Sequence, residues 1–272
     1  MKIEDLFNYR NIKLEEKYRF ILQNSKLLTD QAVFIPFRVD ENQCKENFIS
    51  WLKELWIAPT KLKKHLPDLA PFKGIYVPFY VFRVEADVAY TGTRITEREE
   101  QADLNEDVRE ETSITLPHVL IPAVQSDIAE MATKLEHWSF KECELWEQTK
   151  LGDFSKLEST KTFDAAKEEA SSLVRSKIIK IIKERIGGDR QYIQQKRVDY
   201  KHVTAQFVYL PVWVSSYMYN KKTFKVIADG STGETNAHYP VSKTKYTIFI
   251  LFLLAVVLFL VHLFTATEYV WD

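Results

Sequence analysis

The sequence predicts an α+β fold with mixed or antiparallel sheets, one long amphipathic helix and a C-terminal transmembrane helix. Three observations support this: an uncharged apolar run near the C-terminus, a helical apolar stripe within 163–186, and several stretches rich in β-forming residues. Hydrophobic residues make up 46% and charged residues 28% of the 272, which is typical of a globular chain. The net charge of −1 provides no overall field that favours nucleic acid.

The apolar run at 246–267 is predicted to be a single membrane-spanning helix. No charged residue occurs between Lys245 and Glu268. About 20 helical residues at roughly 1.5 Å each cover the roughly 30 Å hydrocarbon core of a bilayer. On a residue-based insertion scale, its Ile, Leu, Val and Phe side chains contribute about 5–8 kcal/mol in favour of insertion. Residues 268–272 would form a short tail beyond the span.

The charges beside this run predict its orientation. Lys243 and Lys245 precede the run, whereas only Glu268 and Asp272 follow it. The positive-inside rule therefore places the N-terminal side in the cytoplasm. The first residues lack the apolar h-region of a signal peptide. We expect a tail-anchored, single-pass protein whose C-terminal helix contacts the lipid bilayer.

The part before the run divides into an N-terminal segment, 1–30, and a β-rich α+β cytoplasmic region, 31–242. Within the first, Lys17 to Leu28 fits either a helix or a pair of strands. The second begins with a strand candidate at Gln31–Val39 and then Asp40, an N-cap for a helix reaching Trp56. The apolar face expected for this helix consists of Phe48, Trp51, Leu52, Leu55 and Trp56. A short second helix is expected at Lys61–Leu66.

A long β region follows, and the clearest helix interrupts it at Phe163–Ile186. The strand candidates are Gly74–Ala89, Ser113–Ala123, Trp138–Gln148, Gln191–Asp199, His202–Tyr219 and Thr223–Asp229. The charged stretch Glu97–Glu111 is expected to be the solvated tip of a hairpin, and Asp127–Leu135 a short helix. Hairpin turns are expected at Asn220–Lys222 and Asp229–Gly233.

The helix at 163–186 has an apolar stripe and a basic side. The stripe consists of Phe163, Ala166, Ala170, Leu173, Val174, Ile178, Ile181, Ile182 and Ile186, with Gly187-Gly188 as the expected stop. The basic side consists of Arg175, Lys177, Lys180, Lys183 and Arg185. We interpret it as a solvated face, with contact to anionic lipid headgroups or to a partner as the functional alternative. The net charge near zero disfavours nucleic acid as a partner.

Four strand candidates contain a proline between apolar or small residues, at Pro36, Pro78, Pro122 and Pro211. Proline removes a hydrogen-bond donor from a sheet, so these positions are interpreted as bends where strands change partners or leave the sheet. The recurrence also suggests two related halves, about 31–160 and 161–242.

No motif in the sequence predicts a catalytic, cofactor-binding or metal-binding residue. There is no GxxxxGK[ST], GxGxxG, GxSxG or HExxH. Asp103–Asp107 resembles the start of a calcium loop, but Val108 replaces the required glycine and Ile114 the final glutamate. The two cysteines, Cys44 and Cys143, are not in a CxxC pair and fit a reduced compartment.

Several segments occur in an order that resembles a known group of proteins. They are Trp56-Ile57-Ala58-Pro59, Lys73–Phe79, Ile186–Asp189, Leu210–Trp213 and Asp229–Glu234. This order resembles a group of uncharacterised bacterial membrane proteins, many of which begin with a zinc ribbon. Some are labelled primosomal protein N′-like or replication factor Y-like helicase. The resemblance covers roughly Ala32 to the apolar run and implies a bacterial inner membrane.

The chain departs from this group at its N-terminus, because it has no CxxC pairs and therefore no zinc ribbon. It also lacks a nucleotide-binding motif, so the helicase label implies no activity here. The leading hypothesis is a membrane-anchored binding or scaffold module with a protein partner. The alternatives are a membrane-bound enzyme with a site of scattered polar residues, and a nucleic-acid accessory protein. A deep polar pocket would favour the enzyme hypothesis. An exposed apolar patch would favour the scaffold, and a continuous basic groove would favour the nucleic-acid accessory protein.

Overall fold

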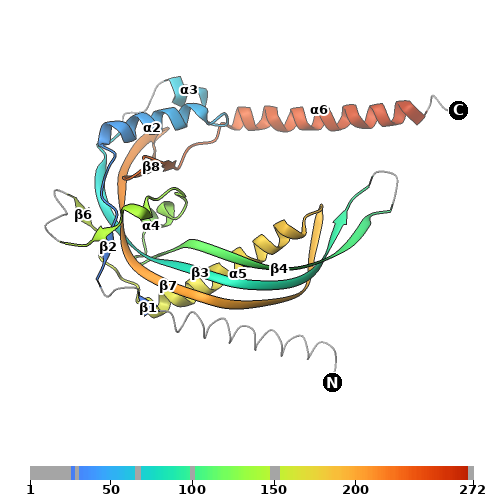
Figure 1. Ribbon diagram of the computed structural model, residues 1–272. Coiled ribbons are helices and arrows are strands. Elements are labelled where there is room, and N and C mark those ends of the chain that lie inside the picture. Colours follow the sequence, from blue (N-terminus) through green and yellow to red (C-terminus); the bar gives the residue numbers. More distant parts are fainter. Residues whose placement is uncertain (1–25, 28–30, 65–68, 99–101, 148–153, 269–272) are drawn as a thin grey trace.

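Three long strands organise the structure: β3 (Lys73–Thr96), β4 (Leu104–Pro122) and β7 (Arg190–Tyr219) (Figure 1). The computed structural model describes residues 26–27, 31–64, 69–98, 102–147 and 154–268. β3 lies between the other two and pairs antiparallel with both. Its run of valine, tyrosine and phenylalanine suits a central strand with both neighbours in place.

Shorter strands extend this sheet. β1 (Lys26–Leu27) and β2 (Val33–Phe34) pair parallel with β7, and β6 (Ser155–Lys156) pairs parallel with β3. β5 (Glu144–Leu145) pairs antiparallel with β2, β8 (Lys222–Asp229) with β7, and β9 (Thr235–Ala237) with β8. In the described part of the chain these strands form one nine-stranded mixed sheet. An α+β class with a large mixed sheet is therefore confirmed.

One end of the sheet is a long arm, which we define as β4 with Val84–Thr96 of β3 and Arg190–Val203 of β7. The helix α5 (Phe163–Ile186) packs along one face of this arm and crosses its strands obliquely (Figure 1). Its buried apolar residues recur at every fourth position and confirm the predicted stripe: Ala166, Ala170, Val174, Ile178, Ile182 and Ile186. The positive φ of 70° at Gly187 ends the helix as predicted.

At the opposite end, α2 (Glu41–Glu54) and α3 (Thr60–Lys64) pack against β7, β8 and β9. Asp40 caps α2 by accepting a hydrogen bond from the Gln43 amide at 2.9 Å, as predicted. The expected apolar face is only partly correct. Phe48 and Leu52 are buried, but Trp56 lies beyond the helix end and is 55% exposed.

The concave bend between the two ends is filled by α4 (Asp127–Ala132) and by the 3-10 helix η1 (Phe140–Glu142). The predicted helix at Asp127–Leu135 is confirmed over its first six residues. The predicted strand Trp138–Gln148 is reduced to β5, Glu144–Leu145, and Gln148 itself lies outside the described residues. The chain turns where the Phe140 amide bonds the Trp138 carbonyl at 2.9 Å, so Trp138 enters the core while Leu145 stays exposed.

The predicted hairpin tip at Glu97–Glu111 is also wrong over much of its length. Strand β4 begins at Leu104, and 104–112 pairs with 88–96. Charged side chains are accommodated in this strand by cross-strand ion pairs such as Arg94–Glu106 at 2.7 Å. The two strands expected at Gln191–Asp199 and His202–Tyr219 are one continuous strand, β7, with irregular register near Asp199–Lys201 and Ile193–Gln195. The expected strand Gln31–Val39 is reduced to Val33–Phe34.

Two of the prolines mark changes of partner, as predicted. Strand β3 pairs with β6 before Pro78, at Ile75 and Tyr76, and with β4 from Phe79 onward. At Pro211, β7 changes from pairing with β2 to pairing with β8. The carbonyl of each proline still accepts a backbone hydrogen bond, from Ala123 at 2.9 Å and from Gly230 at 2.7 Å, respectively. At these two positions the sheet therefore loses a donor where a strand changes its partner.

Candidate functional site

The helix α6 (Lys243–Glu268) leaves the body of the protein beside α3 and is apolar on all sides (Figure 1). Its first 18 residues, Lys243–Leu260, are long and apolar enough to cross a membrane, and none of this stretch is buried against the described chain. Leu254 and Leu258, for example, are 54% and 68% exposed. A helix without a polar face requires apolar surroundings on every side.

The start of α6 is joined to the turn between α2 and α3. The Ser242 amide donates to the Ile57 carbonyl at 3.0 Å. The Lys245 ammonium donates to the carbonyls of Trp56 and Ala58 at 2.9 and 2.8 Å. Because α2 ends at Glu54 and Pro59 follows, these carbonyls have no helical partner, and the ammonium satisfies them. We call Trp56–Lys64 together with Ser242–Phe249 the α6 base.

An aromatic contact completes the α6 base. The rings of Trp56 and Phe249 meet edge to face, with centroids 5.3 Å apart. Trp56 is nevertheless 55% exposed and Tyr246 is 53% exposed. Two large aromatic side chains thus lie at the surface beside the point where the apolar helix begins. Sequence reasoning interpreted Trp56 as part of a buried face and did not connect it with the apolar run.

The five cations predicted on α5 do not form one uniform face. Arg185 donates to Glu110 at 2.7 Å and to Thr112 at 2.6 Å, so it ties α5 to β4. Lys180 lies 3.7 Å from Glu184, one turn away. Arg175 is half-buried, whereas Lys177 and Lys183 are exposed. Only the last half of the exposed side is therefore basic.

The first half of the exposed side of α5 is acidic. Glu168 and Glu169 are exposed there, and Glu169 forms an ion pair with Lys161. Ser172 and Ser176 separate this acidic half from Lys180 and Lys183. An anionic membrane surface would attract one half of the helix and repel the other. The charge distribution on α5 therefore weakens the lipid-contact hypothesis for this helix.

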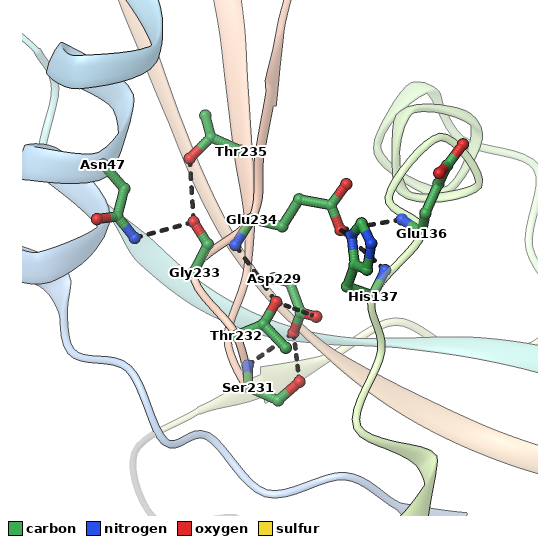
Figure 2. Close-up of polar contacts among 9 residues, drawn as sticks. All are labelled: Asn47, Glu136, His137, Asp229, Ser231, Thr232, Gly233, Glu234 and Thr235. Carbon is green, nitrogen blue, oxygen red and sulfur yellow. Dashed lines mark hydrogen bonds and ion pairs between the residues drawn. The ribbon is translucent and has the colours of Figure 1, made fainter.

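The loop 229–234 between β8 and β9 is the most connected polar feature, and Figure 2 shows its bonds. Asp229 is fully buried, and its carboxylate accepts from the Ser231 amide and hydroxyl at 2.6 and 2.7 Å and from the Thr232 hydroxyl at 2.8 Å. Burial raises the pKa of Asp229 above its ordinary value, although these bonds oppose the shift. All these partners belong to the loop itself, so the carboxylate stabilises a turn.

The same loop joins three segments that are distant in sequence. Glu234 accepts from the amides of Glu136 and His137 at 3.0 and 2.9 Å and lies 3.2 Å from the His137 ring nitrogen. Asn47 of α2 donates to the Gly233 carbonyl at 3.0 Å. Sequence reasoning identified the turn but not these contacts, because they depend on tertiary structure. Since the groups bond one another, we interpret the loop as a structural junction.

The outer face of the arm, opposite α5, carries shallow polar grooves. One has a volume of about 460 Å³ and is lined by residues that include Asp87, Ala89, Glu111, Arg197 and Lys201. A second, of about 320 Å³, continues past Arg109 and Gln195. Small Ala89 on the central strand creates the depression between the longer side chains of its neighbours. Both signs of charge line these grooves, so they are not a continuous basic groove.

The described residues form neither a metal-binding cluster nor a reactive thiol site. No group of three or more His, Cys, Asp or Glu side chains that could hold a metal occurs among them. Burial raises the pKa of Cys44 to about 12 and that of Cys143 to about 11. Both thiols are therefore held in the protonated form at neutral pH, which disfavours thiolate chemistry at either position. His118 stacks on Phe140 with centroids 4.0 Å apart, and burial lowers its pKa.

The chain is similar to the uncharacterized protein YdjG of Bacillus subtilis (strain 168). The two are 26% identical over 225 residues, which are 79% of this chain and 65% of YdjG. The chain thus matches slightly less than two thirds of the length of this relative. No protein-family model matches the chain. No solved structure matches it either.

Proposed function

We propose that this chain is a single-pass membrane protein whose α+β domain lies in the cytoplasm and binds a protein partner at the membrane surface. The observation that carries the proposal is α6, whose stretch Lys243–Leu260 is unburied against the described chain. With 26 residues at roughly 1.5 Å each, α6 is long enough for the roughly 30 Å hydrocarbon core. A bilayer would cover all of its apolar faces at once.

Insertion of α6 would require a change in its direction relative to the arm. In Figure 1 the arm and α6 extend from the body toward the same side. A flat bilayer crossed by α6 at right angles would then also meet the arm, whose surface carries charges such as Asp107, Arg109 and Glu111. Charged side chains are costly in hydrocarbon. We therefore infer a rotation at Ser242 that turns α6 away from the arm.

The α6 base permits such a rotation without separating from the body. The Ser242–Ile57 backbone bond fixes the position where the helix begins. The long side chain of Lys245 can follow the helix and keep its bonds to the carbonyls of Trp56 and Ala58. The contact between Trp56 and Phe249 is the one that depends on helix direction.

The outer face of the arm is the surface that we propose for the protein partner. Its grooves are wide and are lined by charges of both signs, including Asp87, Glu111, Arg197 and Lys201. Mixed charge at a polar surface is a pattern that a protein with complementary charges recognises, whereas nucleic acid requires a positive surface.

Two measurements test the proposal. Protease added to intact spheroplasts should spare the domain before Lys243, and digestion there would contradict the cytoplasmic orientation. A photo-crosslinking residue at position 111, on the outer face, should yield a defined protein adduct in native membranes. The same residue at position 172, on the exposed side of α5, is the matched control. Equal adducts at both positions, or none at 111, would contradict the partner surface.

A further inference from the structure

Basic residues from two distant parts of the sequence gather around the α6 base. Lys61, Lys63 and Lys64 of α3 lie on the segment that receives the start of α6, which itself contributes Lys243 and Lys245. The contacts from Ser242 to Ile57 and from Lys245 to Ala58 hold these two segments together. Figure 1 shows α3 beside the first turn of α6. Neither segment alone would reveal this cluster.

Two ammonium groups of this cluster, those of Lys63 and Lys245, are already bound to backbone carbonyls. The ammonium of Lys63 donates to the Lys53 carbonyl at 2.7 Å, and that of Lys245 is directed to Trp56 and Ala58. Desolvation, and then the charge of Lys245, lower the pKa of Lys63. The side chains of Lys61, Lys64 and Lys243 are exposed. These three are therefore available for an anionic partner.

Two aromatic side chains accompany these lysines. Trp56 is 55% exposed and Tyr246 is 53% exposed, although both are large and amphipathic. Tryptophan and tyrosine concentrate at the level of lipid headgroups, where an apolar ring and a polar tip are both accommodated. Lysine attracts the phosphates of anionic lipids at the same level. The combination fits a membrane interface better than bulk water.

We propose that α3, Trp56 and the first turn of α6 form a collar that binds anionic phospholipid headgroups. The collar rests on the proposed membrane insertion of α6 and assigns the lipid-facing role to α3 rather than to α5. It depends only on the position of the α6 base, which the Ser242–Ile57 bond sets. The collar would hold the turn between α2 and α3 against the cytoplasmic leaflet while the arm extends away from it.

A fluorescent probe at the collar tests this assignment with the full-length chain. Thr60→Cys places an exposed thiol at the start of α3, and it can be labelled selectively because burial keeps Cys44 and Cys143 protonated. The labelled protein, carrying an environment-sensitive dye, is reconstituted into phosphatidylcholine vesicles with and without phosphatidylglycerol. Ser172→Cys on the exposed side of α5 is the matched control.

We expect the emission of the residue 60 probe to shift to shorter wavelength when phosphatidylglycerol is included, and that of the residue 172 probe to stay constant. Replacing Lys61, Lys64 and Lys243 together by Gln should abolish the shift. Replacing Lys177, Lys180 and Lys183 by Gln should leave it intact. An unchanged melting temperature verifies that each triple variant is folded.

The outcomes separate the collar from the anchor. If the protein floats with vesicles but the residue 60 probe responds equally to both lipid compositions, the collar is wrong and the anchor stands. If only the residue 172 probe responds, α5 is the lipid-facing element and the collar is likewise wrong. If the protein floats with neither kind of vesicle, the proposed membrane function fails, and the collar fails with it.

Discussion

The side-chain ammonium of Lys245 lies 2.8 Å from the backbone carbonyl oxygen of Ala58, although 187 residues separate the two in sequence. This bond connects the first turn of the apolar helix α6 to the turn between α2 and α3. The domain and the helix are therefore not independent units joined by a loose linker.

The first prediction concerns the direction of α6. Spin labels at Asp107→Cys on the arm and Leu258→Cys on α6 should lie farther apart in lipid nanodiscs than these residues do in the structure. The reason is that the charged arm cannot enter the bilayer beside α6. Labels at Asp107→Cys and Ser172→Cys, both within the arm and α5, should keep their distance. An unchanged Asp107–Leu258 distance in nanodiscs would refute the proposed rotation.

The second prediction concerns the buried face of α5. Ile182 is fully buried against the arm, whereas Lys177 is exposed on the same helix. Ile182→Asp should reduce the free energy of unfolding by more than about 4 kcal/mol or prevent folding, because it buries an unpaired charge. Lys177→Asp should change the free energy of unfolding by less than about 0.5 kcal/mol. Equal melting temperatures for the two variants would show that the wrong face had been assigned to the core.

The third prediction concerns Gly230, in the loop beside β7. A Cβ atom at this position would lie 2.4 Å from Phe37 Cδ1 and 2.9 Å from Pro211 Cβ. Gly230→Ala should therefore cost about 1–3 kcal/mol of stability through overpacking. Phe37→Ala should reduce the stability of the Gly230→Ala variant by less than it reduces that of the wild type, because it removes the principal clash. Strictly additive losses in chemical denaturation would exclude the proposed contact.

The fourth prediction concerns pH. Asp229 has its pKa raised by burial above the ordinary value of 3.8, so the folded state binds its proton more tightly than the unfolded state. This group therefore stabilises the fold most at low pH, and its contribution is lost as pH rises from 3.8 through the folded pKa. Asp127 has a lowered pKa and acts in the opposite direction. The comparison must therefore be made against Asp229→Asn.

The difference in unfolding free energy between the wild type and Asp229→Asn should decline as pH rises through this interval. Urea denaturation at a series of pH values measures it directly. A difference that stays constant with pH would mean that the hydrogen bonds from Ser231 and Thr232 balance the effect of burial, and one that grows would mean that they outweigh it; either result would contradict the prediction.

Local patterns in the sequence were sufficient for the elements whose partners are regular. The four-residue recurrence from Ala166 to Ile186 predicted α5, and Asp40 predicted the start of α2, because both depend on helical geometry alone. The prolines at 78 and 211 predicted changes of strand partner, since a missing donor has the same consequence in any sheet.

Features that depend on tertiary contacts were not predictable in this way. The charged strand from Leu104 was mistaken for a solvated tip, because its charges are balanced by residues such as Arg94 on the next strand. The alternation at Trp138–Leu145 imitates a strand but accompanies a turn into the core. The α6 base combines α3 with a helix that begins about 180 residues later, so no local pattern reveals it.

The most direct test of the central claim is extraction of lysine variants of α6 with alkaline carbonate. The apolar side chains favour insertion by about 5–8 kcal/mol, and one central lysine costs about 2.5–3.5 kcal/mol. Leu254→Lys alone should leave much of the protein in washed membranes, whereas Leu254→Lys with Val257→Lys, one turn away, should release most of it. The two positions are 54% and 55% exposed, so neither change disturbs the domain. Full retention of the double variant in washed membranes would show that α6 is not what holds the protein there.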